Sequence, residues 1–255
     1  MLNDFAIADS ATLQCLRGVG EIVVGGDALS LGPLVEILMF RRRSISPGVR
    51  IKLAVPKDVG HALRQFPAVR TWSFGQAGGT GVLRAQHGIP SEGDELESQK
   101  FLLALLRAAV SAGMPKPAAQ ALTGAAGELL DNITEHAGPG EDALAAFSVY
   151  AGSLWLSVGD SGQGMLSTYS GHPKVTTAKV ALRMAVVEHC SSTGDPERGQ
   201  GFRNLLRALG SLDASVRVRT GDASLECEGT ASSRPWVSRE QAQLVGCVVS
   251  AHLTW

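Results

Sequence analysis

Residues 128–137, which read ELLDNITEHA, are the stretch of the chain that decides its fold. In an α-helix, residues four apart lie about 40° from one another, so Glu128 and Asn132 share one face and His136 lies at its edge. The apolar residues Leu129 and Ile133 point elsewhere, towards a core. Taken alone, this polar face also fits the solvated side of an ordinary helix.

A glycine-rich turn follows a predicted strand further along the chain, where residues 158–165 read VGDSGQGM. An aspartate at a strand end, here Asp160, can accept a hydrogen bond from an exocyclic amine. Gly162 and Gly164 permit close approach of the backbone and a positive φ. A plain glycine-rich turn remains the alternative for this motif by itself.

A third motif, RGQGF at residues 198–202, opens a predicted helix over 201–209. Glycines before a helix leave backbone N–H groups exposed where the helix dipole is positive, which suits a phosphate chain. The alternative for Gly199 and Gly201 is a simple helix cap.

In this order, the three motifs resemble those of the GHKL ATPase superfamily (gyrase, the ninety-kilodalton heat-shock chaperone, histidine kinases and MutL). The resemblance covers about residues 97–255 and implies the Bergerat ATP-binding fold, an α/β two-layer sandwich. It implies that Asn132 coordinates the Mg²⁺ that bridges the phosphates of ATP. It also implies that Glu128 acts as general base or positions the nucleophile, and that Asp160 recognises the adenine amino group.

The same resemblance implies that Gly162 and Gly164 line the adenine and ribose, and that Gly199 and Gly201 belong to the second phosphate loop. Residues 165–198 then correspond to a lid over ATP. The second glycine motif lacks the third glycine of the family, which leaves the lid conformation open. A contact to the γ-phosphate would come from Lys174, Lys179 or Arg198, and the alternative for each is a solvated surface charge.

The composition argues against several classes of function, although it leaves a local basic patch open. The 255 residues carry a net charge of -1, and only 5% are aromatic. The net charge argues against general electrostatic binding of nucleic acid, and the low aromatic content argues against a surface on which bases stack. No apolar run approaches the ~20 residues of a membrane span, and the N-terminus has no export signal, so we expect a cytoplasmic protein. The four cysteines form no CxxC pair, and buried structural thiols are the favoured interpretation.

The first part of the chain predicts a small α/β unit over residues 1–80. Strands are expected at 21–24 and 50–55, and helices over 27–43 and from Asp58 onward. The run EIVV, then LSLGPLVEIL at 29–38, then RIKLAVP resembles a STAS-like module, the fold of anti-sigma-factor antagonists. Ser30 then stands where such modules carry a phosphorylatable serine, with a plain N-cap as the alternative. The glycine-rich residues 81–96 are interpreted as a linker, followed by the ATP-binding domain at 97–255.

The rest of the chain predicts α/β order as well. Helices are expected over 99–112, 118–137, 176–189 and 201–209. Strands are expected at 146–149, 154–158, 215–219, 224–228 and 244–253, with a turn at Gly221-Asp222 between the third and fourth of them.

The branch of the family decides the expected function. The chain ends near the last expected strand, which disfavours the branches that need a transducer domain. His61, in HALRQFP, superficially resembles a phosphoacceptor histidine, but its proline is one position late. The best resemblance is to the anti-sigma-factor serine kinases, which bind ATP and phosphorylate a STAS partner.

Three hypotheses follow from this resemblance. In the first, the chain is a Mg-ATP-dependent protein serine kinase or slow ATPase. In the second, it is a switch without catalysis, whose ATP or ADP occupancy controls binding to a partner. In the third, the pocket is vestigial. We expect a regulatory protein partner, of STAS type or related to a sigma factor, no nucleic acid and no membrane, and a homodimer by family analogy only.

Overall fold

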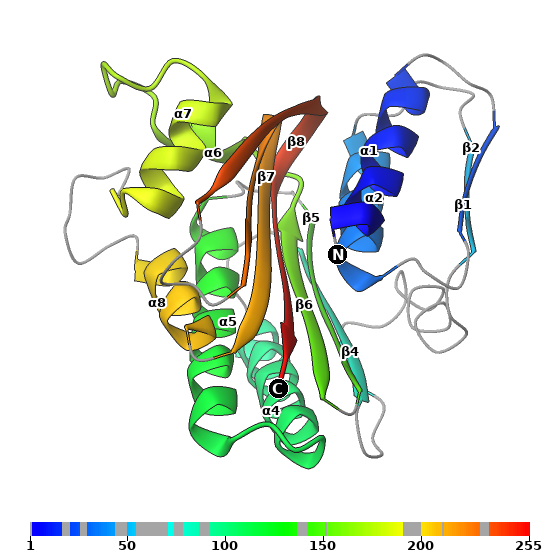
Figure 1. Cartoon of the computed structure of the whole chain (residues 1–255), viewed down its shortest axis with the longest axis vertical. Coiled ribbons are helices and arrows are strands. Elements are labelled where there is room, and N and C mark those ends of the chain that lie inside the picture. Colours follow the sequence, from blue (N-terminus) through cyan, green and yellow to red (C-terminus); the bar gives the residue numbers. More distant parts are fainter. Residues whose placement is uncertain are drawn as a thin grey trace.

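The structure is a computed structural model (Figure 1). It describes residues 2–16, 21–25, 30–43, 50–54, 71–73, 79–86, 92–136, 142–150, 152–190, 200–210, 212–229 and 235–255. The predicted helix from Asp58, together with His61, Arg198 and Gly199, lies outside these residues.

An antiparallel six-stranded sheet with the order β3-β4-β5-β6-β8-β7 forms the centre of the molecule. Its strands are β3 (Thr71–Ser73), β4 (Gly79–Gln86), β5 (Asp142–Tyr150), β6 (Ser153–Asp160), β7 (Asp213–Glu228) and β8 (Val237–Thr254). Successive strand residues face opposite sides, and here both sides are apolar. In β5, Ala145 and Phe147 join one core, whereas Leu144 and Ala146 join another.

Three helices cover one face of the sheet: α4 (Glu92–Ser111), α5 (Lys116–His136) and α8 (Gln200–Leu209) (Figure 1). In this core an aromatic contact joins α4 to β5, where the centroids of the Phe101 and Phe147 rings lie 5.3 Å apart. Leu129, Leu130 and Ile133 are buried in this core, as the periodicity of α5 predicts.

The opposite face is covered by α1 (Leu2–Leu16) and α2 (Leu31–Arg43) (Figure 1). The parallel pair β1 (Glu21–Gly25) and β2 (Arg50–Ala54) lies beyond these two helices. The α/β sandwich predicted from sequence is therefore confirmed, with an additional helical layer on the second face. The STAS-like arrangement of residues 1–80 is not confirmed, and α1 is a helix that the sequence analysis did not predict.

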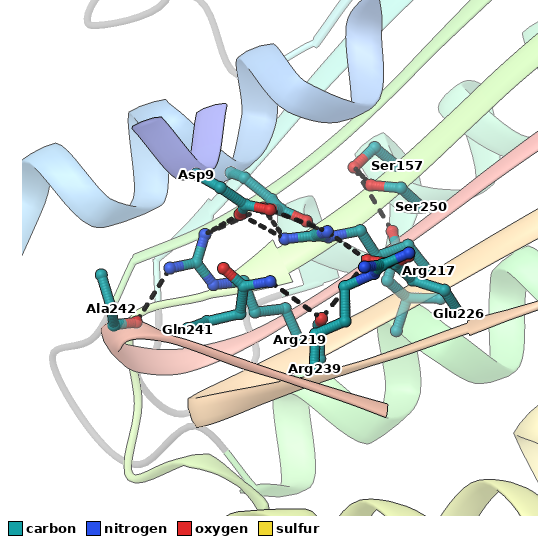
Figure 2. A network of polar contacts seen from close by, with 12 residues as sticks. Asp9, Ser157, Arg217, Arg219, Glu226, Arg239, Gln241, Ala242 and Ser250 are labelled. Carbon is teal, nitrogen blue, oxygen red and sulfur yellow. Dashed lines mark hydrogen bonds and ion pairs between the residues drawn. The ribbon is translucent and has the colours of Figure 1, made fainter. Parts of the chain in front are cut away.

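Buried ion pairs join α1 and α2 to β7 (Figure 2). The guanidinium of Arg217 on β7 lies 2.8 Å from Glu36 of α2 and 2.6 Å from Asp9 of α1, and it also contacts Glu226. Arg219 lies 3.0 Å from Glu36. A buried charge is tolerated only when it is paired and hydrogen-bonded, so these residues fix how the two helices sit on the sheet.

The strand β7 doubles back on itself near its middle. Gly221 has a φ of 55°, and the N–H of Gly229 donates to the carbonyl of Ala214 at 2.6 Å. A straight strand would hold these two residues about 50 Å apart, at roughly 3.3 Å per residue. The two predicted strands at 215–219 and 224–228, with a turn at Gly221-Asp222, are therefore confirmed.

The predicted linker at 81–96 is corrected by the structure. Residues 79–86 form β4, which pairs with β5 along its whole length, and α4 begins at Glu92. The glycine-rich composition suggested a linker, but Gly81 lies within the strand, where it has a packing role. A Cβ at Gly81 would lie 2.1 Å from the ring of Phe147, its partner across the strands, so the ring needs this position to be glycine. The division of the chain into two domains stays a prediction.

The helices predicted over 99–112, 118–137, 176–189 and 201–209 are confirmed, with one refinement. The helix expected over 176–189 consists of α7 (Ala178–Leu182) and a π-helix, η1 (Arg183–Val187). Within the described parts of the chain, no helix combines the length and hydropathy that a membrane crossing requires.

Candidate functional site

The polar face of α5 meets the first turn of α8. A Cβ at Gly201 would lie 2.7 Å from the side-chain nitrogen of Asn132 and 3.7 Å from Oε2 of Glu128. The structure therefore brings together three of the residues singled out from sequence, one from the third motif and two from the first. Gly201 allows α8 to approach α5 this closely, which is a stricter requirement than a helix cap.

A residue that the sequence analysis missed completes this contact. Asn204 donates from Nδ2 to Oε1 of Glu128 at 2.6 Å, and Arg207 donates from Nη1 to Oδ1 of Asn204 at 3.3 Å. Asn204 lies about one turn after Gly201, so the two share a face of α8. This spacing is the signal that could have identified it.

The second motif lies at the C-terminal end of β6. Asp160 is buried, and its Oδ1 accepts a hydrogen bond from the N–H of Gly162 at 2.8 Å. This bond holds the carboxylate close to the turn. Gly162 is not among the described glycines with a positive φ, so the turn does not use the conformational freedom that glycine permits at this position.

Gly164 does have the predicted positive φ, at 72°. A Cβ there would lie 2.7 Å from Oγ1 of Thr220 and 3.0 Å from the carbonyl oxygen of Gly246. Thr220 itself accepts from the N–H of Met165 at 3.1 Å and donates to the Gly246 carbonyl at 2.7 Å. This threonine, which the sequence analysis did not single out, thus ties the start of α6 (Gly164–Thr168) to β7 and β8.

Three side chains form a row across the end of the sheet. Asp160 pairs with Cys247 across β6 and β8, and Cys247 pairs with Thr220 across β8 and β7. Directly opposed residues in antiparallel strands point to the same face, and Cys247 packs against the core under α5 and α8. Burial raises the pKa of the Cys247 thiol, and the charge of Asp160 raises it further.

The first two motifs lie at the same end of the fold. The helix α5 ends at His136 and β5 begins at Asp142, so the start of β5 lies near the end of α5. Ala143, near the start of β5, pairs with Asp160. Asp160 therefore lies at the same end of the sheet as the C-terminal turns of α5, which carry Glu128 and Asn132.

Most of the region that corresponds to a lid is folded. A small apolar cluster contains Tyr169, Val175 and Ala181, and the Tyr169 hydroxyl donates to the carbonyl of Cys190. Burial raises the pKa of Tyr169 to about 12, so its hydroxyl stays protonated. Lys174 and Lys179 are both exposed.

The helix α7 rests on β7 at its turn. A Cβ at Gly221 would lie 2.8 Å from the Cβ of Ala178, the first residue of α7. Near the end of the described part of the lid region, His189 has a left-handed φ of 53° and a buried Nδ1 without a hydrogen-bond partner among the described residues. Burial lowers the pKa of His189, and the charge of Arg203 lowers it further.

No family model and no curated protein matches the chain. Among solved structures, the chain is similar to the histidine kinase domain of the blue-light-activated histidine kinase EL346 from Erythrobacter litoralis. The sequence identity is 13% and the TM-score is 0.31, and the match covers 99% of this chain and 94% of that chain. A likeness this distant carries no argument about function.

Proposed function

We propose that the chain binds Mg-ATP at the end of the sheet where α5, α8 and β6 meet. The observation that carries this proposal is the approach of Gly201 to Asn132 and Glu128, at the end of the fold where Asp160 lies. The N-terminus of α8 supplies N–H groups and a positive dipole for phosphate. The site then has a carboxylate for the adenine amine at one side and a phosphate-binding helix at the other.

The residues at this site fit a magnesium ion. Mg²⁺ prefers oxygen ligands, and it is usually held by one or two protein side chains together with phosphates and waters. Asn132 lies beside Gly201 with its side-chain nitrogen nearest that glycine, and its amide oxygen is the atom that would hold the ion. When bound, the ion neutralises charge on the phosphates.

Asp160 is suited to the adenine end of the site. The bond from Gly162 holds its carboxylate at the strand end, and the buried position strengthens any hydrogen bond that it accepts. Cys247 and Thr220 lie in the same row and would border the base.

We place the reaction in the class of phosphoryl transfer to a protein serine or to water. The oxygen of the serine or water forms a bond to the γ-phosphorus as the bond from that phosphorus to the β–γ bridging oxygen breaks. ADP leaves, and the proton of the attacking hydroxyl passes to Glu128. Such a reaction depends mainly on the positioning of the reacting groups and on charge neutralisation. The polar face of α5 would provide the positioning.

A switch without catalysis is the second candidate, and one observation favours it. The start of α6 is tied to Thr220, α7 rests on Gly221, and the same strand carries Arg217, which holds α1 and α2. A nucleotide that orders the lid would thus act on the strand that holds the N-terminal helices. This candidate predicts partner affinity that depends on the nucleotide, with negligible hydrolysis.

Calorimetric titration with ATP and ADP, with and without Mg²⁺, tests the binding proposal. In Asp160→Asn, loss of a hydrogen bond to a charged group should weaken binding by about 1.5–3 kcal/mol, roughly ten- to hundredfold. Asp222→Asn, at an exposed turn of β7, is the matched control and should bind as the wild type does. Absence of binding at millimolar nucleotide would defeat both candidates.

The variant Glu128→Ala separates the two candidates. If the chain is a kinase or ATPase, this variant keeps nucleotide binding and loses turnover. If the chain is a switch, the wild type already turns over negligibly and its partner affinity changes between ATP and ADP. Rapid turnover that Glu128→Ala leaves unchanged would contradict the role of this carboxylate.

A further inference from the structure

We infer that Asn204 is a positioning residue for Glu128, and that α8 thereby sets the orientation of the catalytic carboxylate. This inference rests on the proposed function. It concerns a residue outside the three sequence motifs, and it follows from the contact between α8 and α5.

The geometry of the contact fixes which way the Asn204 amide faces. Arg207 has only hydrogen-bond donors, so the atom of Asn204 that faces it, at 3.3 Å, is the carbonyl oxygen Oδ1. The amide nitrogen then faces Glu128 and donates to Oε1 at 2.6 Å. The chain Arg207–Asn204–Glu128 therefore has a single consistent assignment of donors and acceptors.

With one oxygen of Glu128 held by Asn204, the other is directed towards the start of α8. Oε2 lies 3.7 Å from where a Cβ of Gly201 would stand. The terminal torsion of a glutamate is broad and roughly two-fold, so a carboxylate without a partner samples many orientations. The bond from Asn204 removes this freedom and leaves Oε2 on the side where we propose the phosphates bind.

Asn204 and Gly201 also lie on the same face of one short helix. Gly201 abuts Asn132, and Asn204 binds Glu128, so successive turns of α8 contact the two proposed site residues of α5. A shift of α8 along α5 would therefore move the proposed phosphate loop and the carboxylate together. Precise placement matters here, because a misplacement of about 1 Å at a reacting group can cost roughly a hundredfold in rate.

A merely structural role for this bond makes a different prediction. If Asn204 only joined two helices, its removal would lower the melting temperature and leave kcat per folded molecule unchanged. The test is therefore a comparison of kcat, KM for ATP and ADP affinity in the full chain, with thermal unfolding measured on the same samples. Gln99→Ala is the control, since Gln99 is exposed on α4 and bonds only to Glu95 within the described contacts.

We expect Asn204→Ala to lower kcat by about ten- to a hundredfold, with KM and ADP affinity essentially unchanged. Asn204→Asp keeps the shape of the side chain but replaces the donor by a second carboxylate, so it should lower kcat at least as much. Arg207→Ala should have a smaller effect in the same direction. Gln99→Ala should match the wild type in all three measurements.

A double-mutant cycle with Glu128→Ala provides the decisive readout, by single-turnover measurement. If Asn204 acts through Glu128, adding Asn204→Ala to Glu128→Ala causes no further loss. Equal losses in both backgrounds, or an unchanged kcat in Asn204→Ala, would overturn the inference. A wild type that binds ADP without turning over ATP would overturn it and leave the binding proposal standing, whereas a wild type that binds no nucleotide would defeat the proposed function itself.

Discussion

The guanidinium Nε of Arg217 and the carboxylate Oε1 of Glu36 lie 2.8 Å apart, and the exposed fractions of the two side chains are only 1% and 0%. The two residues are 181 positions apart in the sequence, on β7 and α2. Glu36 also binds Arg219, so one buried acid serves two buried arginines. The layer of α1 and α2 is therefore joined to the sheet by specific charges as well as by apolar packing.

Glu36→Gln should destabilise the protein strongly. The substitution keeps the size of the side chain but leaves Arg217 and Arg219 with one negative charge fewer in a buried interface. Removing one partner of a buried ion pair costs about 3–5 kcal/mol. Unfolding in urea, monitored by circular dichroism, measures the loss.

Lys100→Ala is the control for this experiment. Lys100 pairs with Glu97 at 2.7 Å, but its side chain is 56% exposed. Exposed pairs are worth less than about 1 kcal/mol, so this variant should unfold near the wild type. Equal and small losses in the two variants would show that Glu36 does not neutralise the arginines.

Asp9→Asn should remove one pH-dependent component of stability. Burial raises the pKa of Asp9 above its ordinary value of 3.8, although the neighbouring charge of Arg217 lowers it. The folded state then holds this proton more tightly than the unfolded state does. The stability contributed by Asp9 is complete below pH 3.8 and is lost as the pH rises through the folded-state pKa.

The difference in unfolding free energy between the wild type and Asp9→Asn should therefore decrease as the pH rises, and then become constant. Urea unfolding of both proteins at several values between about pH 4 and pH 7 measures this difference. A difference that increases with pH would mean that the ion pair with Arg217, and not burial, governs Asp9.

Gly246→Ala should destabilise the end of the sheet at the proposed adenine site. Gly246 has a φ of 95°, and a Cβ there would lie 2.0 Å from the carbonyl oxygen of Asp160. Backbone atoms must move to relieve such a contact, so we expect a loss of several kcal/mol, on the order of other strained substitutions. Thermal unfolding should show a lower melting temperature.

Gly124→Ala is the matched substitution. Gly124 lies inside α5, and a Cβ there would meet nothing within 4 Å. Alanine is favoured over glycine within a helix by about 1 kcal/mol, so this variant should melt above the wild type. A Gly246→Ala variant that melts at or above the wild-type temperature, as Gly124→Ala should, would contradict the close approach at Gly246.

Gly201→Ala should weaken nucleotide binding more than it weakens the fold. Its Cβ would lie 2.7 Å from the side-chain nitrogen of Asn132, the end of a flexible side chain that can move away. Stability should therefore change by less than about 1.5 kcal/mol, while Asn132 leaves the position from which it would hold the metal. Calorimetry with Mg-ATP and thermal unfolding of the same variant give the two values, and normal Mg-ATP affinity would contradict this placement of the site.

The elements of the second half were largely predictable because each has a strong local pattern. The period of α5, the turn at Gly221 and the strand before Asp160 are all visible in short windows of sequence. The glycines around residue 81 were misread because the reason for one of them, the ring of Phe147, lies far away along the chain. A strand glycine that accommodates an aromatic ring looks like a loop glycine when only its neighbours are seen.

The candidate site was predictable in part for the same reason. Glu128, Asn132 and Gly201 belong to local motifs, and the structure brings them together. No short stretch of sequence identifies the other residues of the site, because each gains its role from a partner on another helix or strand. These residues are Asn204, Thr220 and Cys247. The arginines of β7 are a stronger case, since Arg217 within a strand gives no sign that its partners are Asp9 and Glu36.

The pairing of Asp9 with Arg217 constrains the order in which parts of the chain can fold during synthesis. The two residues are separated by 208 positions, and at roughly 5–20 residues per second the ribosome delivers Arg217 about 10–40 s after Asp9. Throughout that interval, α1 and α2 carry acids whose neutralising partners do not yet exist. We therefore expect the first two helices to dock last, after the hairpin of β5 and β6 has formed, although they are the first to leave the ribosome.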